Sequence, residues 1–429
     1  MTLNAKTVED AIPARRRARW LAWLVASLVV LAIIAGVIAF LSRPPRATRL
    51  LLGAVGNALG LQISAQGGDY RLRGTPMLDV RGLVAREPGA AQPLLRADRI
   101  VLSLPWSTIR SRGGDLTIDR IELERPIVGV AALQHWLAQR PPGPTRIPVL
   151  IRGVRIRDGR AIADGWRIDA IALDLPTLAP RRPVAATVSG RYRSDSLQAP
   201  FALNVALTSP VNDAAIGIAG RIELERADWR LPTNVVVSGK MRPASNGWQL
   251  QHARLQASAR YESQDTQVPF ALGIAGTLRQ AKGSVQLSPV AIAARGNGLV
   301  PRLDASGIAA FSEALEIRLA GALADWPSAW PSLPSPLDQS NAALPVRLDY
   351  LGTPDLSGLA TLRLSRDDVR FDGRFHPTGI ASWFAADASN PLPPLDGHLV
   401  APRLDIAGAS LTGVDMTIDD QAIAEPPAR

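Results

Sequence analysis

SGRYRSDSLQAPFALNVALT (residues 189–208) and SARYESQDTQVPFALGIAGT (residues 258–277) align without a gap, and 11 of the 20 aligned positions are identical. In both copies an apolar side chain occupies every second position after the shared proline. This alternation is typical of a β-strand that has one face in apolar surroundings and the other in polar surroundings. The chain therefore contains a β unit that is used at least twice.

The alternation extends well beyond the repeat. RIELE at 221–225, GWQLQ at 247–251 and VRLDY at 346–350 follow it, and GWRIDAIAL at 165–173 resembles GWQLQHARL at 247–255. Because a repeated β unit cannot bury its apolar face alone, we expect the units to stack into one extended sheet. About 25 strands, spaced roughly 4.8 Å apart, would measure on the order of 120 Å.

Pairs of Asp or Asn with Gly favour the positive φ angles of two-residue hairpin turns, so we expect turns where such pairs occur. These pairs are Asp158-Gly159, Asp164-Gly165, Asn246-Gly247, Asn297-Gly298, Asp372-Gly373 and Asp396-Gly397.

Composition excludes several classes of protein. Of the 429 residues 47% are hydrophobic and 20% charged, which excludes a disordered chain. There is no Cys, so disulfides and thiolate chemistry are excluded. The formal net charge is +10, but residues 1–60 hold eight basic and two acidic side chains, or +6 of the total. The other 369 residues carry only +4, which argues against nucleic-acid binding.

The basic segment surrounds a candidate membrane helix. WLAWLVASLVVLAIIAGVIAFL at 20–41 contains no charged residue, and 22 residues of helix cover roughly 33 Å, enough to span a bilayer. A cleaved signal peptide would have a shorter apolar region and would end at small residues. Five basic residues precede the helix and three follow it, so we expect a cytoplasmic N-terminus and a periplasmic remainder.

The rest of the chain divides by pattern. Apolar spacing predicts helices at 46–61, next to the membrane, and at 130–140. The predicted organisation is a cytoplasmic basic N-terminus at 1–19, the transmembrane helix at 20–41, an N-terminal β region with the juxtamembrane helix at 42–140, repeated β segments at 141–323, a loop rich in Pro and Trp at 324–340, a C-terminal β segment at 341–420 and a disordered tail at 421–429. We expect Trp326 and Trp330 of the loop to pack against the sheet.

No catalytic, metal-binding or cofactor-binding residues are predicted. HExxH, GxSxG and phosphate-loop motifs are absent from the sequence, and the four histidines are far apart. Asp367-Asp368 and Asp419-Asp420 are adjacent pairs, whose side chains point to opposite faces of a strand and suit solvated strand ends. An apolar sheet face remains as the notable surface. It could hold acyl chains, or a second sheet or helices could close it as an ordinary core.

Three stretches resemble the AsmA family, which is related to the TamB proteins. They are GLQISAQGGDYRLRGTPMLDVRGL at 60–83, PLLRADRIVLSLPWSTIRSRGGDLTIDRIELERPIV at 93–128 and VAPRLDIAGASLTGVDMTIDD at 400–420. The resemblance covers about the first 130 and the last 30 residues. It implies a mainly β fold, in which an N-terminal transmembrane helix precedes an elongated, curved, repetitive antiparallel-type sheet, groove-like in shape, with a few short helices. It also implies a protein of the bacterial inner membrane that is linked to phospholipid traffic and outer-membrane assembly.

Two main functional hypotheses follow. In the first, phospholipid acyl chains lie along a groove, and the lipid-contact candidates are Phe201, Leu203, Val205, Phe270, Leu272 and Ile274. In the second, the chain is a non-enzymatic anchored scaffold that binds an outer-membrane assembly or secretion partner by strand addition. An anchored hydrolase is a third class, for which the sequence offers no site. Neither main hypothesis requires a cofactor or nucleic acid.

Overall fold

The computed structural model describes residues 60–423, except 72, 112–115, 140–146, 211–212, 245–246, 264–265, 282, 299, 328–341, 386–393, 407–408 and 421–422. The predicted membrane helix at 20–41, the tail beyond 423, Trp330 and all but the last two residues of the predicted helix at 46–61 lie outside this part. Gly60 and Leu61 are not helical. Within the described part, no helix is both long and apolar enough to span a membrane.

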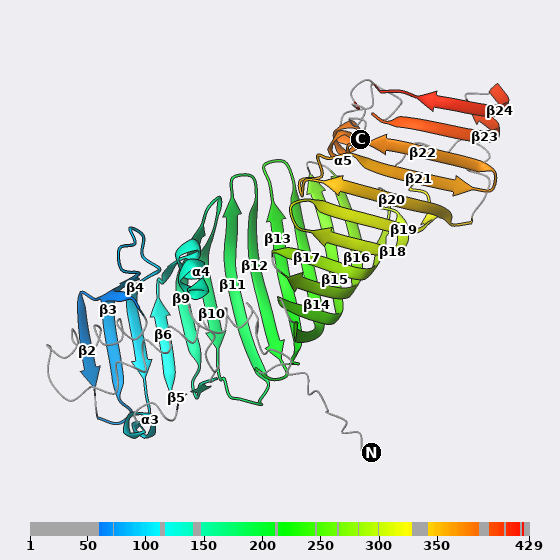
Figure 1. Ribbon diagram of the computed structural model, residues 1–429. Helices are drawn as coiled ribbons and strands as arrows, with labels where there is room; N and C mark the ends of the chain where they lie inside the picture. Colours follow the sequence, from blue (N-terminus) through cyan, green and yellow to red (C-terminus); the bar gives the residue numbers. More distant parts are fainter. Residues whose placement is uncertain are drawn as a thin grey trace, which may run out of the picture.

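The fold is mainly β, as predicted, and one curved sheet runs the length of the molecule (Figure 1). Its first part combines short strands with two helices. The elements are β1 (Gln62–Ser64), β2 (Gly67–Arg71), β3 (Met77–Arg86), β4 (Leu95–Ser103), α3 (Trp106–Arg110), β5 (Thr117–Ile118), β6 (Arg120–Glu124), β7 (Ile127–Gly129), α4 (Val130–Ala138), β8 (Val149–Leu150) and β9 (Val154–Ala163). The predicted helix at 130–140 is thus confirmed as α4.

The middle and last parts are successive antiparallel hairpins. The elements are β10 (Trp166–Leu175), β11 (Val184–Ser194), β12 (Gln198–Leu207), β13 (Ala215–Glu225), β14 (Arg230–Ala244), β15 (Gly247–Ser263), β16 (Thr266–Ala281), β17 (Ser284–Gly296), β18 (Arg302–Phe311), β19 (Leu315–Asp325), β20 (Leu344–Gly352), β21 (Ala360–Arg366), β22 (Val369–Phe375), α5 (Pro377–Ala385), β23 (Asp396–Ile406) and β24 (Ala409–Ile418).

The sheet has 22 strands, fewer than the 25 expected. Moreover, β1 and β2 both pair with β3, and β6 and β7 both lie between β4 and β9. The strands therefore fill 20 successive places, which corresponds to about 90 Å rather than 120 Å. In Figure 1 the first strands run up the page and the last run across it, which is the accumulated twist of a long sheet.

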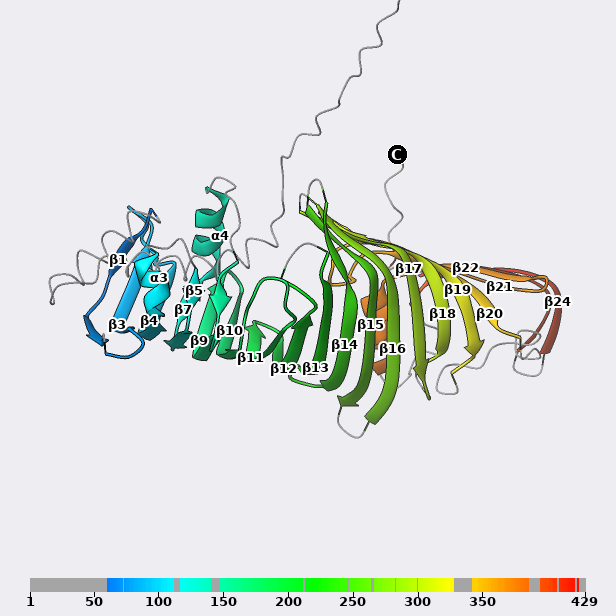
Figure 2. The ribbon, with the colours of Figure 1, turned by 90° about the horizontal axis from the view of Figure 1, so that it is seen from below.

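The sheet is antiparallel over most of its length, in agreement with the expectation of an antiparallel-type sheet, and it departs from this pattern near α4. Strand β9 pairs in parallel with β6 and β7, and β5 pairs in parallel with β8 in a separate two-stranded sheet. Parallel neighbours need a long crossover connection. Here the crossover contains α4, which stands on one side of the sheet in Figure 2.

The two repeat copies stack in one sheet, as predicted. The first copy spans β11 and β12 and the second spans β15 and β16. The two similar segments that begin with Gly-Trp occupy different kinds of strand, however. GWRIDAIAL lies in the separate strand β10, whereas GWQLQHARL forms the first half of β15, a single strand of 17 residues.

Three of the six expected turns are wrong. Asp158-Gly159 lies inside β9, Asp372-Gly373 inside β22, and Asp396-Gly397 begins β23. Gly373 and Gly397 face each other beside Phe371, and a Cβ on either would come within 3 Å of its ring (2.7 and 2.9 Å). These glycines make room for an aromatic ring instead of a turn. Asp164-Gly165 does connect β9 to β10, and Asp367-Asp368 forms the turn from β21 to β22.

Five bulges interrupt the strands. They lie at Asp158 in β9, Ala170 in β10, His252 in β15, Ser288-Pro289 in β17 and Ala324 in β19, where the register shifts by one residue. Bulges bend a strand and increase its twist. In Figure 2 the strands from β13 to β17 are bowed along their length, so that the sheet forms a curved trough.

Two apolar cores occupy the ends of the sheet. At the first end, Leu102 and Ile121 of the sheet pack with Trp136 of α4 and with residues of the β5–β8 ribbon. At the second end, Leu344, Leu399 and Leu404 pack together, with Trp326 against them as predicted. Between these cores, from β13 to β17, no described residue belongs to either cluster, although single residues such as Val290 are buried.

The two edges of the sheet differ. At the first edge β1 has three residues, and β2 has five and carries Asp69 and Arg71. At the other edge β24 has ten residues and one charged side chain, Asp415. Short, charged edge strands resist pairing with other chains, whereas long neutral ones do not.

Candidate functional site

One row of apolar residues crosses the sheet from core to core. Each residue of the row is directly opposite the next in the neighbouring strand, so all share one face. We call it the central row, and its members are Val80, Ile100, Leu123, Ile156, Leu173, Val188, Leu203, Gly220, Val235, Ala257, Leu272, Ala294, Leu303, Leu323 and Leu344. The row crosses 15 strands, or about 65 Å.

A second row runs beside it. The second row starts at β12 and reaches β24 through residues that are again all apolar or Gly. Its members are Val205, Ile218, Val237, Leu255, Ile274, Ile292, Ala305, Gly321, Val346, Leu364, Phe371, Leu399 and Met416. Together the rows make an apolar band that continues through both repeat copies.

Charge separates the two faces completely between β11 and β18. All fifteen Asp, Glu, Lys and Arg residues within these strands lie on the face opposite the central row. They are Arg191, Arg193, Arg221, Glu223, Glu225, Arg230, Lys240, Arg242, Arg254, Arg260, Glu262, Arg279, Arg295, Arg302 and Asp304. We call the uncharged face of these eight strands the trough face and the other the outer face.

Exposure changes along the central row. Ile100 and Leu123 at the first core are 4% and 5% exposed, and Leu344 at the second core is 1% exposed. In the middle, Val188 and Leu203 are only half-buried. Among the described residues no helix or second sheet packs on this stretch. The trough face is therefore an apolar surface that is mostly half-buried between two covered ends, although single residues such as Val235 and Val290 are buried, at 9% and 1% exposed.

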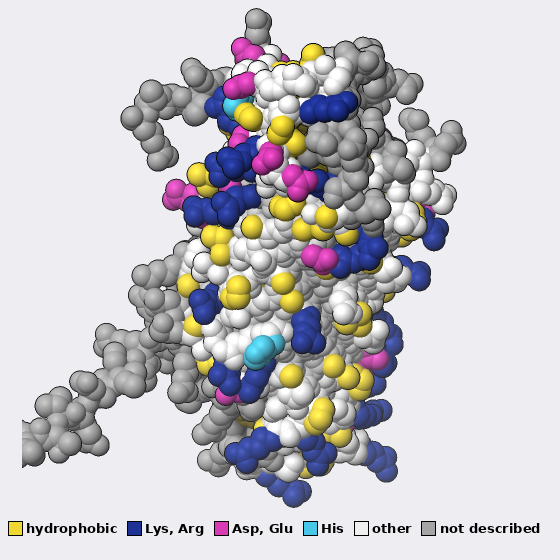
Figure 3. Space-filling model, turned by 90° about the vertical axis from the view of Figure 1, so that its right-hand side faces the viewer, with side chains coloured by type: hydrophobic (Ala, Val, Ile, Leu, Met, Phe, Trp, Pro, Cys, Tyr) yellow, Lys and Arg dark blue, Asp and Glu magenta, His cyan; other side chains and the backbone are white. Residues whose placement is uncertain are grey.

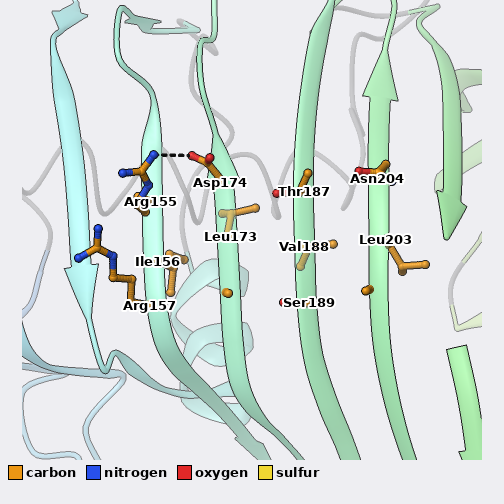
Figure 4. Close-up of a pocket in the computed structure, with 12 residues that line it drawn as sticks. Arg155, Ile156, Arg157, Leu173, Asp174, Thr187, Val188, Ser189, Leu203 and Asn204 are labelled. Atoms are coloured by element: carbon orange, nitrogen blue, oxygen red, sulfur yellow. Dashed lines mark hydrogen bonds and ion pairs between the residues drawn. The ribbon is translucent and has the colours of Figure 1, made fainter. Parts of the chain in front are cut away.

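A shallow hollow of about 420 Å³ lies where β9–β12 adjoin, but most of its lining, including Ala202 and Asn204, is on the face opposite the central row. Figure 4 shows Ile156, Leu173, Val188 and Leu203 of the central row side by side on β9–β12, among the residues that line it. The charged and polar members of the lining point away from the central row, so this hollow does not belong to the trough face. Arg155 and Asp174, also in the lining, form an ion pair of 3.4 Å.

The six lipid-contact candidates all lie on the trough face. Phe201, Leu203 and Val205 are half-buried, while the alternating residues Ala202 and Asn204 are exposed on the outer face. Phe270, Leu272 and Ile274 occupy the equivalent places on β16 and are also half-buried. Leu203 and Leu272 belong to the central row, and Val205 and Ile274 to the second row.

Sequence reasoning missed the residues that continue these rows. Leu173 and Val188 were not identified because each repeat copy was considered separately. The signal that would have found them is the position of the hairpin tips, which fixes the register between strands and so shows which residues are opposite one another.

Aromatic pairs mark one side of the trough. Tyr192 stacks on Trp166, with ring centroids 5.9 Å apart, and Tyr261 packs on Trp229 at 6.2 Å. Tyr192 and Tyr261 are equivalent residues of the two repeat copies. Tyr and Trp suit places where an apolar surface meets water, since each has an apolar ring and a polar atom.

About half of the charged residues of the outer face form ion pairs. Arg295 binds Asp304 at 2.6 Å, and Asp169 of β10 lies within 4 Å of Arg160, Arg167 and Arg193. Burial raises the pKa of Asp169, but the hydrogen bond from Arg167 and the charges of the three arginines outweigh it, so that the pKa is lowered. Figure 3 shows basic and acidic side chains interspersed with small hydrophobic patches rather than a continuous block of one charge. 

Within the described residues no three His, Asp or Glu side chains converge as a metal site would require. His398 contacts Asp415 at 2.6 Å, and His135 lies 4.0 Å from Glu87. These are isolated pairs on the surface.

Comparison of the chain with protein-family models, with curated proteins and with solved structures finds no match. The resemblance to the AsmA family thus rests on the sequence stretches alone, and any function must be argued from the trough itself.

Proposed function

We propose that this protein binds or conducts phospholipid acyl chains along the trough face, as a membrane-anchored periplasmic protein of AsmA type. The observation that carries the proposal is the segregation of charge: eight neighbouring strands place every charged side chain on the outer face, while most residues of the trough face between the two cores are only half-buried. Large exposed apolar surfaces on proteins serve as binding sites.

The chemistry of the trough matches an acyl chain. Such a chain has no hydrogen-bonding groups, so a surface without charges loses nothing when the chain displaces water from it. Each 100 Å² of apolar surface removed from water contributes about 2.5 kcal/mol. Because the central row is unbroken, a chain that moves along it leaves one apolar contact for another of the same kind.

The proposal includes the place of the protein in the cell. Residues 20–41 anchor the chain in the bacterial inner membrane with the N-terminus in the cytoplasm, and the sheet extends into the periplasm. A sheet of about 90 Å would carry acyl chains away from that membrane in outer-membrane lipid homeostasis. No bond is made or broken in this process.

Photocrosslinking in cells tests the acyl-chain proposal. A photoreactive amino acid replaces Val205 or Ile274 in the full chain, and adducts are identified by mass spectrometry after denaturing purification. We expect phospholipid adducts at both positions. Leu203→Asp and Leu272→Asp should abolish them, because an ionised carboxylate in the central row repels the apolar chain.

The control is Asn204→Asp, which adds the same charge to the outer face of the same strand. It should leave the adducts unchanged. Equal labelling in the folded Leu203→Asp protein and in the unchanged chain would show that the trough does not hold lipid.

A second candidate function is that of an anchored scaffold, and the edge strand β24 favours it. Its ten residues pair only with β23 among the described strands, and Leu411 on it is 49% exposed. A partner strand could add to this edge by main-chain hydrogen bonds. Thr412→Pro and Met416→Pro should then abolish co-purification of a stable partner without changing lipid adducts at Val205. A partner retained by both variants would rule out binding at this edge.

A further inference from the structure

The trough face carries one amide side chain in an otherwise apolar row near the ends of β14–β19. The row is defined by direct pairing, and we call it the rim row. Its members are Pro243, Trp248, Gln280, Val285, Phe311 and Leu315.

The rim row faces the same way as the central row. Phe311 lies eight residues from Leu303 on β18, and Leu315 lies eight residues from Leu323 on β19. An even separation without an intervening bulge keeps two residues of a strand on one face. Gln280, opposite Val285 and Trp248, therefore belongs to the trough face, whereas its neighbour Arg279 points to the outer face.

Gln280 has an unusual environment for an amide. Its Oε1 atom is shielded from solvent and has no hydrogen-bond partner among the described residues. A buried acceptor without a donor costs about 1–3 kcal/mol. The side chain as a whole is half-exposed, so a rotation about its last bond can present the oxygen to a ligand.

The neighbours of Gln280 suit the boundary between water and an apolar phase. Val285 and Phe311 are 36% and 40% exposed, and Trp248 is half-buried. From Gln280 back to Leu272 of the central row, β16 extends about 26 Å. One leaflet of a bilayer is about 15 Å thick in its hydrocarbon part, so an acyl chain fits along this path.

We propose that the rim row holds the junction between headgroup and acyl chains of a bound glycerolipid, and that Gln280 accepts a hydrogen bond from a headgroup that carries a donor. The ligand class is thus a phospholipid with an ammonium or hydroxyl donor, such as phosphatidylethanolamine or phosphatidylglycerol. Phosphatidylcholine, whose headgroup has no donor, is discriminated against. This inference rests on the proposed acyl-chain function.

The test uses the full chain with a photoreactive amino acid in place of Leu287, a residue of the trough face one step inward from the rim row. The protein is reconstituted in vesicles that contain equal amounts of phosphatidylethanolamine, phosphatidylglycerol and phosphatidylcholine with identical acyl chains. Mass spectrometry then counts the adducts of each lipid. We expect about a fivefold excess of each donor lipid over phosphatidylcholine, as one hydrogen bond would give.

Gln280→Leu should bring the three yields to equality, because it keeps the volume and removes the acceptor. The matched control is Gln286→Leu, which changes a glutamine of the outer face on the next strand and should keep the fivefold excess. Equal yields in the unchanged chain, or an excess that survives Gln280→Leu, would overturn the inference while the acyl-chain proposal stands. An absence of lipid adducts from every variant would contradict the acyl-chain proposal itself.

Discussion

The covered end of the sheet and its open middle are built from the same strand pattern but differ in what lies above it. Ile100 and Leu123 at the covered end, and Val188 and Leu203 in the middle, belong to one continuous row of apolar side chains. At the covered end α4 and the β5–β8 ribbon pack on that row, whereas in the middle it is half-exposed. The comparison shows that alternation creates an apolar face, and that the segments between strands decide whether this face is covered as a core or stays open.

The largest effect should come from placing a charge at each of the two regions. Leu102→Asp buries a carboxylate at a site 1% exposed and should destabilise the folded state by about 4 kcal/mol or more. Leu203→Asp in the open trough should cost about 1 kcal/mol or less, because water reaches the new carboxylate. Urea unfolding followed by circular dichroism measures both. Equal losses of stability would mean that the trough is a closed core.

Removal of the cover should have a smaller effect. Trp136 of α4 is 4% exposed and packs in the first core, so Trp136→Ala should cost about 3–5 kcal/mol. Hydrogen exchange should speed up in β4, β6 and β9 but not in β12–β16. His135→Ala, on the exposed side of the same helix, is the control and should change stability by less than about 0.5 kcal/mol. Uniform loss of protection along the sheet would contradict separate stability of the two regions.

Adding a methyl group to a glycine of the trough should reduce the stability of the fold by an intermediate amount. A Cβ on Gly220 would lie 2.1 Å from the carbonyl oxygen of Ala202, whereas a Cβ on Gly217 of the same strand would meet nothing within 4 Å. Gly220→Ala should therefore destabilise the protein by about 1–3 kcal/mol, and Gly217→Ala should be nearly neutral. Thermal unfolding of both variants checks this, and identical melting temperatures would be inconsistent with the close approach of β12 and β13.

The smallest effect concerns pH at the covered end. The hydrogen bond from Arg152 lowers the pKa of Asp119, although burial opposes it. The carboxylate thus stabilises the fold above its unfolded pKa of about 3.8, and this contribution is lost as pH falls through the lower folded pKa. Asp119→Asn should reduce stability at neutral pH and flatten its fall below pH 4, measured by urea unfolding at several pH values. A parallel fall in both proteins would contradict the role of Asp119.

The sequence predicted which face of a strand each side chain lies on better than it predicted which residue lies opposite it in the adjacent strand. Phe201, Leu203 and Val205 lie on one face because alternation is a local property of an extended chain. The register that places Leu203 opposite Val188 and Gly220 depends on where the hairpins turn. Three of the turns that were expected from Asp-Gly pairs lie elsewhere in the structure. At Gly373 and Gly397 the absence of a side chain serves a contact with Phe371 in a neighbouring strand, which no local pattern reveals.

Two other features depend on contacts between distant segments. The parallel pairing of β9 with β6 follows from the crossover that contains α4. The sequence of residues 130–140 predicts a helix, but it does not predict the path of the chain after that helix. Gln280 was not identified because a polar residue in an alternating stretch is expected on the outer face. Only the pairing with Trp248 and Val285 places it on the trough face.

From β10 to β23 every strand pairs with the strands before and after it in the sequence. Interactions in such an array are between nearest neighbours, so its stability is a sum of local terms and its growth during folding can proceed hairpin by hairpin. Insertion or deletion of one hairpin would lengthen or shorten the molecule by about 10 Å while the remaining pairings persist. Length is therefore a property that can change in steps of one hairpin, and the similar segments at 189–208 and 258–277 lie two hairpins apart in this array.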